Sequence, residues 1–364
     1  MTSLSADDLR WLDAAARMAM PLVGTTAENP TVGALVVDEF KQTILGRGVT
    51  APGGRPHAEP QALEEAAGRA RGRTLYVTLE PCNHWGRTPP CVDAVIRAGI
   101  RRVVIGVGDP DRRTAGEGVR RLREAGMDVV VADAPLSRRL HEGFLTRQTL
   151  GRPFVIAKLA VSRDGKIGLP DRGRVQITGE EARRWTHMQR ALVDAVMVGG
   201  RTAELDNPLL TVRLPGFEER THLRVILLGR GGIGDRLEMV HGVSPNPTVV
   251  IGPEGAAPEL PRGVEYIPVA SVGRRPVPVA ALRALAERGV STVLVEGGAA
   301  LSESLLAADL VDRFHVLNGT TTVGSRGVPA TILGGLEGRV MAAGLTEVDQ
   351  RALGEDNLRT FERV

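Results

Sequence analysis

Apolar positions in the first 150 residues fall into two periodicities that alternate along the chain. Short apolar runs predict strands, and they cover residues 31–37, 44–49, 74–79, 103–107 and 128–131. Positions at helical spacing predict helices over residues 1–20, 58–70, 92–98 and 119–125. Gly99 and Gly126 follow two of these helices as stop signals. The order of elements predicts a mainly parallel sheet with helices on its faces.

The second part of the chain repeats this alternation after Gly151-Arg152-Pro153. Strands are predicted over residues 154–161, 195–198, 223–228, 248–251 and 292–295. Thr178, followed by Glu180 and Glu181, is typical of a helix N-cap with acids in the first turn, and that helix should run to about Ala191. Further helices are predicted over residues 279–288 and 300–308. We therefore expect two α/β domains, spanning residues 1–147 and 148–364.

Composition narrows the class of protein. The chain has 364 residues, which suits two domains, and 42% apolar with 24% charged residues is an ordinary globular balance. Aromatic residues make up only 3%, and the net charge of +3 comes from basic residues dispersed along the chain. Both features argue against a nucleic-acid-binding protein. No apolar run approaches the 18 residues of a membrane span, so we expect no membrane partner. Two cysteines and a first segment without a basic, then apolar, pattern indicate a reducing, cytoplasmic setting.

Four residues in the first domain form a candidate metal site. His57 and Glu59 open a predicted helix, Cys82 follows the 74–79 strand, and Cys91 opens the next helix. One imidazole and two thiolates bind zinc and leave its fourth position open for water, whose pKa zinc lowers to about 7. Glu59 is then the carboxylate that carries protons to a leaving amine. This set predicts hydrolytic deamination of a ring carbon such as that of a pyrimidine.

Three other interpretations of these residues stay open. The two cysteines could form a disulfide, or they could be unrelated buried thiols. The zinc site could also be closed and structural, with His84 as the fourth ligand.

The spacing of the cysteines points to one family. Cytidine and nucleic-acid deaminases use Pro-Cys-x-x-Cys, whereas here eight residues separate the cysteines in EPCNHWGRTPPC. This string, with PHAE upstream, resembles the bifunctional riboflavin-biosynthesis deaminase–reductases known as RibD. The strings NPTVG, GDPDRRTAGEG, KLAVSRDG, ITGEEAR, DNPLLTVR and VEGG extend the resemblance over nearly the whole chain.

The resemblance implies a cytidine-deaminase-like αβα domain followed by a dihydrofolate-reductase-like α/β domain. The first would deaminate 2,5-diamino-6-(5-phosphoribosylamino)pyrimidin-4(3H)-one with Zn²⁺, and the second would reduce the ribosyl side chain to ribityl with NADPH. By matching position, the residues toward substrate would be Asn29, His84, Asp109, Lys158, Arg174, Arg190, Leu210, Arg213 and Glu296. Those toward NADPH would be Ala160, Gln176, Thr202, Asp206, Gly229 and Gly298. We also expect a homo-oligomer whose only other partner is the small-molecule substrate.

The chain departs from the family pattern mostly in its second domain. Gln176 stands where a Trp is usual, Asn207 replaces an Asp, and Leu228-Gly229 replaces Asp-Ser. In the first domain, Thr50 replaces a His and Asp111 an Asn. The alternative function is therefore a zinc deaminase for another pyrimidine or purine, with a degenerate reductase domain. Hypotheses from other classes are a nucleic-acid-editing protein and a non-catalytic metal-binding scaffold.

Overall fold

The computed structural model describes residues 4–171, 173, 175–229, 233–234, 237–242, 244–255, 257–331 and 335–363. The chain folds into two compact units, Met1–Gly151 and Arg152–Val364, and each is described by itself.

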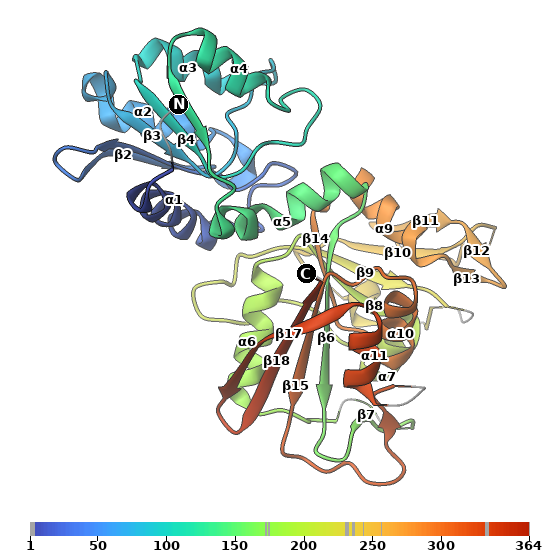
Figure 1. Cartoon of the computed structure of the whole chain (residues 1–364). Coiled ribbons are helices and arrows are strands. Elements are labelled where there is room, and N and C mark those ends of the chain that lie inside the picture. Colours follow the sequence, from blue (N-terminus) through green and yellow to red (C-terminus); the bar gives the residue numbers. More distant parts are fainter. Residues whose placement is uncertain are drawn as a thin grey trace. The chain divides into compact units, whose positions relative to one another are not determined.

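The first unit is built on a five-stranded sheet (Figure 1). Its strands are β1 (Gly33–Asp38), β2 (Thr43–Val49), β3 (Thr74–Val77), β4 (Arg102–Ile105) and β5 (Asp128–Val131). Its helices are α1 (Ala6–Ala19), α2 (Ala58–Ala66), α3 (Cys91–Ala98), α4 (Glu117–Glu124) and α5 (Pro135–Leu150), with short 3₁₀ turns η1 (Met20–Leu22), η2 (Pro52–Gly54) and η3 (Ala67–Ala70).

The sheet order is β2-β1-β3-β4-β5, and the sheet is mixed. β3, β4 and β5 are parallel, as the sequence predicts, but β1 is antiparallel to both of its neighbours. The prediction of a mainly parallel sheet is therefore wrong for β1 and β2, because the four residues between them can close only a hairpin. α1 packs on one face, and α2, α3 and α4 cover the other, so the unit has three layers.

Two glycines on β2 set how closely α2 approaches the sheet. A Cβ at Gly46 would lie 2.1 Å from the Ala62 carbonyl oxygen, and one at Gly48 would lie 2.0 Å from that of Ala58. Since real Cβ atoms do not approach carbonyl oxygens so closely, only glycine allows this contact. α2 carries two of the candidate site residues at its N-terminus, so this packing also fixes their depth.

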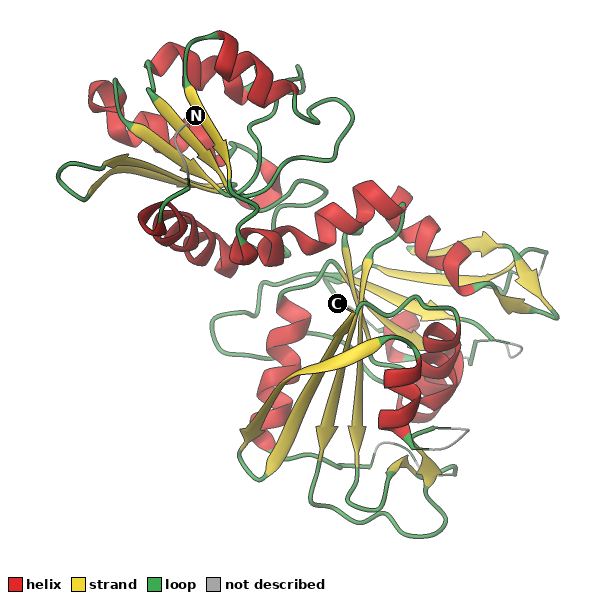
Figure 2. Ribbon diagram, in the orientation of Figure 1, coloured by secondary structure: helices red, strands yellow, loops and turns green. Residues whose placement is uncertain are grey.

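The second unit is built on a nine-stranded sheet, with helices shown in red on its faces (Figure 2). The strands of this unit are β6 (Phe154–Val161), β7 (Lys166–Gly168), β8 (Ala195–Gly199), β9 (Leu223–Leu227), β10 (Thr248–Pro253), β11 (Val264–Val269), β12 (Ser271–Val272), β13 (Arg275–Pro276), β14 (Thr292–Val295), β15 (Arg313–Asn318), β16 (Val328–Pro329), β17 (Leu345–Leu353) and β18 (Asp356–Arg363). Its helices are α6 (Glu180–Ala191), α7 (Gly200–Asp206), α8 (Glu238–His241), α9 (Pro278–Glu287), α10 (Ala299–Ala307) and α11 (Leu336–Ala342).

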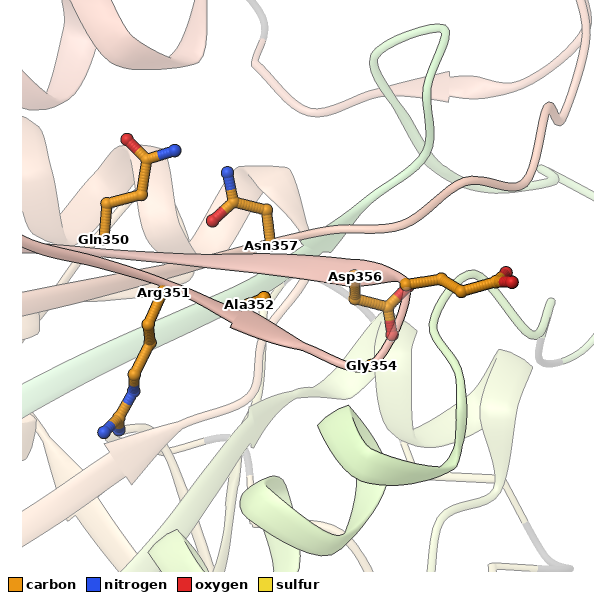
Figure 3. A pocket seen from close by; sticks show the side chains of 7 residues that line it. Gln350, Arg351, Ala352, Gly354, Asp356 and Asn357 are labelled. Carbon is orange, nitrogen blue, oxygen red and sulfur yellow. The ribbon is translucent and has the colours of Figure 1, made fainter.

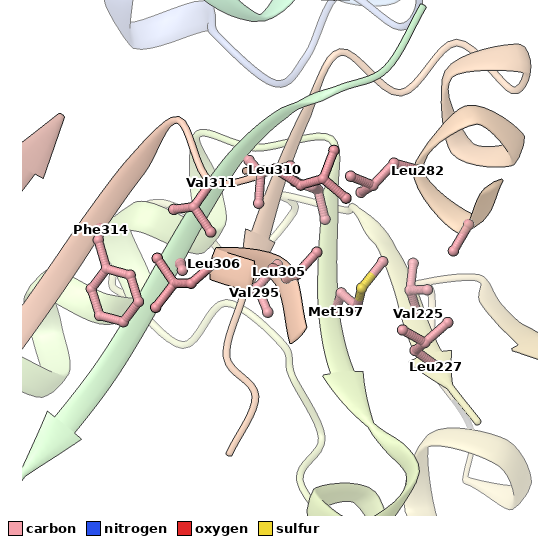
Figure 4. Packing of buried hydrophobic residues seen from close by; sticks show 14 of the residues in the cluster. Met197, Val225, Leu227, Leu282, Val295, Leu305, Leu306, Leu310, Val311 and Phe314 are labelled. Atoms are coloured by element: carbon pink, nitrogen blue, oxygen red, sulfur yellow. The ribbon is translucent and has the colours of Figure 1, made fainter. Parts of the chain in front are cut away.

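The order of the large sheet is β11-β10-β9-β8-β14-β6-β15-β18-β17. All neighbours from β11 to β15 are parallel, and β18 and β17 add an antiparallel edge. Apolar side chains alternate between the two faces of the central strands, so each face has its own core. The larger core packs Met197 and Val225 against Leu305 and Leu306 of α10 (Figure 4). The polar groups that follow β6, β8 and β14 therefore lie at the edge where ligands bind in open α/β sheets.

The boundaries of most predicted elements agree with the structure within two residues, but the helix predicted over residues 1–20 begins at Ala6, and the N-cap of α6 lies one residue later than predicted. Its N-cap is Gly179 and carries no side-chain cap, so the prediction of Thr178 is wrong. Instead, the Asp356 carboxylate accepts the Gly179 N–H at 2.7 Å, a bond between residues 177 positions apart that no local pattern announces. Within the described residues, no helix is both long and apolar enough to cross a bilayer.

Candidate active sites of the two units

The predicted metal ligands lie together in the first unit. His57 is the N-cap of α2, Cys91 is the first residue of α3, and Cys82 lies in the segment that follows β3. Their ligand atoms all lie within 4.8 Å of one another. His57 Nδ1 is 3.2 Å from Cys91 Sγ and 3.7 Å from Cys82 Sγ. The Cys91 backbone N–H donates to Cys82 Sγ at 3.4 Å. The Cys82 sulfur thus lies at the N-terminus of α3, where the positive end of the helix dipole favours a thiolate.

The electrostatics of this cluster suit proton transfer. The hydrogen bonds from Cys91 and His57 hold the pKa of the Cys82 thiol well below its usual range. Glu59 is buried in the first turn of α2 with 3% exposure. Burial, with the neighbouring Cys82 charge, raises the pKa of Glu59 to about 7. A carboxyl that is half protonated near neutral pH can both accept and return a proton.

The alternative interpretations of the cysteines find no support in the structure. Both are free thiols whose sulfurs face one imidazole, so they are neither disulfide-bonded nor unrelated. Among the residues that the structure describes, no fourth His, Cys, Asp or Glu joins the cluster. His84 Nδ1 lies instead 3.4 Å from Thr114 Oγ1.

Asn29 lies beside Gly54, three residues before His57. Its amide packs against Gly54, where an added Cβ would lie 2.2 Å from Asn29 Nδ2. Gly54 has a φ of +87° and precedes the cis Arg55-Pro56 bond that leads into His57. The glycine thus allows Asn29 to approach the entrance of α2.

Glu80 organises the segment that carries Asp109, and the sequence analysis missed it. The Glu80 side chain is buried and accepts three backbone N–H groups, from Asp109 at 3.3 Å, Gly116 at 3.2 Å and Val119 at 3.1 Å. It therefore ties this segment and the N-terminus of α4 to the strand edge beside Cys82. Asp109 is itself mostly buried, which raises its pKa to about 7. The only sequence signal for Glu80 is its position two residues before a ligand.

In the second unit, three predicted substrate residues form one buried ionic group. Glu296, at the carboxyl end of β14, accepts two hydrogen bonds from Arg190 of α6, one of them 3.0 Å long from Nη2. Lys158 Nζ of β6 lies 3.5 Å from Glu296 Oε2. Burial raises the pKa of Glu296, but the charges of Arg190 and Lys158 outweigh it and lower the pKa to about 2. Nε and Nη2 of the Arg190 guanidinium therefore donate to Glu296 and are not available to a phosphate.

Leu210 and Arg213 belong to an irregular segment beside this group. Arg190 Nη1 donates to the Thr211 carbonyl at 3.0 Å, which links the segment to Glu296. His187 Nδ1 is 3.2 Å from the Arg213 backbone nitrogen. His187 was not among the residues predicted from the sequence, although its position one helical turn before Arg190 is a usable signal.

Of the predicted NADPH residues, two are brought into contact. The Gly298 N–H at the start of α10 donates to Thr202 Oγ1 of α7 at 3.2 Å. Ala160 lies on β6 paired with Leu317, while Gln176, Asp206 and Gly229 are exposed. Arg174, which was predicted to contact substrate, lies outside the described residues.

A separate shallow hollow lies at the turn between β17 and β18 (Figure 3). Its lining residues are Gln350, Arg351, Ala352, Gly354, Glu355, Asp356 and Asn357. None of the residues predicted to carry the chemistry lines it.

Comparison with known proteins identifies the same two parts. The family model of the cytidine and deoxycytidylate deaminase zinc-binding region matches residues 6–107, and that of the RibD C-terminal domain matches residues 153–358. The riboflavin biosynthesis protein RibD of Synechocystis is 36% identical over 346 residues, covering 94% of this chain and 93% of that protein. The Escherichia coli protein is 34% identical and covers 86% and 88%.

Solved structures agree. The deaminase/reductase of Thermotoga maritima has a TM-score of 0.85 at 32% identity, covering 98% of this chain and 99% of that one. RibD of Acinetobacter baumannii has a TM-score of 0.83 at 30% identity, with the same coverage. With family models over both parts and relatives matched along nearly their full length, this chain belongs to the RibD family of riboflavin biosynthesis proteins.

Proposed function

We propose that this chain catalyses two steps of riboflavin biosynthesis. The first unit hydrolyses the amine of a diaminohydroxyphosphoribosylaminopyrimidine, and the second reduces the resulting 5-amino-6-(5-phosphoribosylamino)uracil, the reactions named for the Thermotoga maritima protein. The observation that carries the proposal is the three-ligand cluster with a buried, non-ligating Glu59, in a chain that matches RibD proteins along 94% of its length. The alternative of another substrate with a degenerate reductase domain is not favoured.

The residues present fit a zinc ion. The ligand atoms of one imidazole and two thiols lie within 4.8 Å of one another, and the buried Glu59 carboxyl is not one of these ligand atoms. His57, Cys82 and Cys91 would hold the ion, which supplies an activated water to the ring carbon. The family's zinc-binding deaminase region covers all three ligands.

Glu59 moves the protons of the deamination. Protons of the attacking water pass through Glu59: one reaches the exocyclic nitrogen, which leaves as ammonia, and the other ends on the neighbouring ring nitrogen, so that a carbonyl oxygen replaces the amine. A pKa of about 7 keeps both forms of Glu59 available at neutral pH. Asn29, His84 and Asp109 surround the substrate in this proposal, and Glu80 holds the segment of Asp109 in place.

The second unit binds NADPH and the deaminated product at the carboxyl edge of its sheet. NADPH supplies a hydride to the ribosyl side chain. We place the cofactor at Ala160, Gln176, Thr202, Asp206, Gly229 and Gly298, and the substrate at Lys158, Arg174, Arg190, Leu210, Arg213 and Glu296. The contact between Thr202 and the start of α10 supports this, because a helix N-terminus receives phosphate.

Three further predictions complete the proposal. We divide the chain into a deaminase domain at residues 1–147 and a reductase domain at 148–364, and the compact unit that begins at Arg152 supports this boundary. The free thiols of the metal cluster suit a reducing, cytoplasmic compartment. A homo-oligomer remains a prediction, which sedimentation velocity measures.

A coupled assay tests both activities. The diaminopyrimidine phosphate is supplied with NADPH, and ammonia release and NADPH oxidation are followed separately. The proposal expects ammonia first and NADPH consumption only after it. Ammonia without NADPH oxidation would remove the reductase and leave the deaminase. No ammonia from the zinc-loaded protein would remove the deaminase, and the uracil substrate supplied directly with NADPH would then test the reductase.

A further inference from the structure

Residues 209–213 of the second unit form a segment whose backbone is held by side chains instead of by a sheet or helix. His222 Nε2 lies 2.6 Å from the Leu210 carbonyl oxygen. Arg190 donates to the Thr211 carbonyl at 3.0 Å, and His187 lies 3.2 Å from the Arg213 nitrogen. Side chains of α6 and of His222, the residue that precedes β9, therefore set the conformation of this segment.

Leu210 has an unusual backbone conformation. Its φ is +52°, in the left-handed region that leucine rarely adopts, and its side chain is buried in the smaller core. Such a conformation persists only where the surroundings determine it. The side chain is fixed by packing, and the hydrogen bond from His222 fixes the peptide that follows.

The hydrogen bonding of His222 defines its protonation. Because a carbonyl oxygen only accepts, the proton lies on Nε2. Nδ1 is buried and has no hydrogen-bond partner among the described residues, so a second proton there would find no acceptor. Burial, together with the positive charges of Arg190 and Arg224, lowers the pKa of His222 to about 4. His222 is thus a neutral donor of fixed orientation with 4% exposure.

We propose that His222 is a positioning residue of the reductase, which holds Leu210 in its left-handed conformation so that the 210–213 segment is shaped to receive the substrate. The inference rests on the proposed reductase, in which Leu210 and Arg213 contact substrate. His222 acts through the Leu210 carbonyl and does not itself touch the reacting atoms.

Three substitutions separate this role from general damage to the fold. His222→Gln places an amide N–H where Nε2 stands and keeps the donor. His222→Asn is equally polar but too short to reach the carbonyl, and His222→Leu removes the donor. The exposed His241, at the end of α8, provides a matched control as His241→Gln. Deaminase activity of the same chain reports on its integrity.

We expect His222→Asn and His222→Leu to raise the KM for 5-amino-6-(5-phosphoribosylamino)uracil about tenfold, the size of one lost hydrogen bond between neutral groups. The KM for NADPH and the deaminase rate should stay at wild-type values, and His222→Gln should restore the substrate KM. A wild-type KM in all three variants overturns the proposal. So does a His222→Gln variant that is as impaired as His222→Asn.

Hydrogen exchange of the Arg213 amide, whose N–H donates to His187 Nδ1, provides a readout that needs no turnover. The wild type and His222→Gln should protect this amide, and His222→Asn should lose that protection because the segment loosens. If the wild type fails to reduce the uracil substrate, the proposed function fails, and exchange still decides whether His222 holds the segment. Equal exchange in all variants would refute the positioning role.

Discussion

Glu80→Gln is the substitution that most directly tests how the deaminase site is assembled. In the native protein, Glu80 Oε1 accepts the Val119 N–H, and Oε2 accepts the N–H groups of Asp109 and Gly116. The glutamine amide offers one acceptor oxygen, and its NH₂ group must face at least one of these buried N–H donors. A lost hydrogen bond to a charged group costs about 1.5–3 kcal/mol, and the missing charge near the N-terminus of α4 adds about 0.3–1 kcal/mol. We therefore expect the first unit to lose about 2–4 kcal/mol of stability.

The assay measures unfolding and both activities on one preparation. A loss of this size lowers the melting temperature of a unit of about 150 residues by about 4–16 °C. Because the segment of Asp109 loosens, the deaminase KM should rise about tenfold while zinc content and the reductase rate stay unchanged. Glu117→Gln is the matched control, since Glu117 also lies in the first turn of α4 but is exposed and pairs with Arg120. If Glu80→Gln matches this control in stability and KM, the three N–H groups do not hold the segment of Asp109 in place.

Other predictions concern the chemistry and its pH dependence. Glu59→Gln should retain zinc, measured by metal analysis. It should lower ammonia release by at least about 10²-fold, because no other described carboxyl stands at the cluster. An active variant would remove Glu59 from the mechanism. Chelation, or Cys91→Ser, should abolish ammonia release but leave NADPH oxidation intact when the uracil substrate is supplied. The folded pKa of Glu296, about 2, lies below its ordinary value of 4.5, so its stabilising contribution is present above about pH 4.5 and disappears toward pH 2. The difference in unfolding free energy between wild type and Glu296→Gln should therefore narrow over that range in urea titrations, and a constant difference would contradict the assignment.

Sequence patterns predicted the helices, strands and helix ends that depend on neighbouring residues in the chain. The strands 154–161 and 292–295 and the helix stop at Gly99 follow from local periodicity and from a glycine at φ +68°. The metal cluster could also be predicted from the sequence. Its residues stand at helix starts and just after a strand, and the topology brings these positions to one edge of the sheet. β17 and β18 were not predicted, since β17 is exposed along most of its length and mixes charged and apolar residues without alternation.

The residues that position the sites were missed for a related reason. Glu80, His187 and His222 each bind backbone groups of distant or irregular segments, and a hydrogen bond to a main-chain atom leaves no pattern of side-chain types. Substrate-facing residues can be found by motif, but the residues that hold them become visible only in three dimensions.

The close contact between α2 and β2 implies that the first unit tolerates mutation unevenly. At Gly46 and Gly48 the backbone of one element occupies the space of a missing methyl group in the other. A conservative Gly48→Ala exchange would act like a wedge, lifting the helix end that bears His57 and Glu59. Trimming a large side chain elsewhere in the core leaves a void, which costs stability but does not push two backbones apart. In a mutational scan of deamination, the smallest residues of this interface should therefore be its least replaceable.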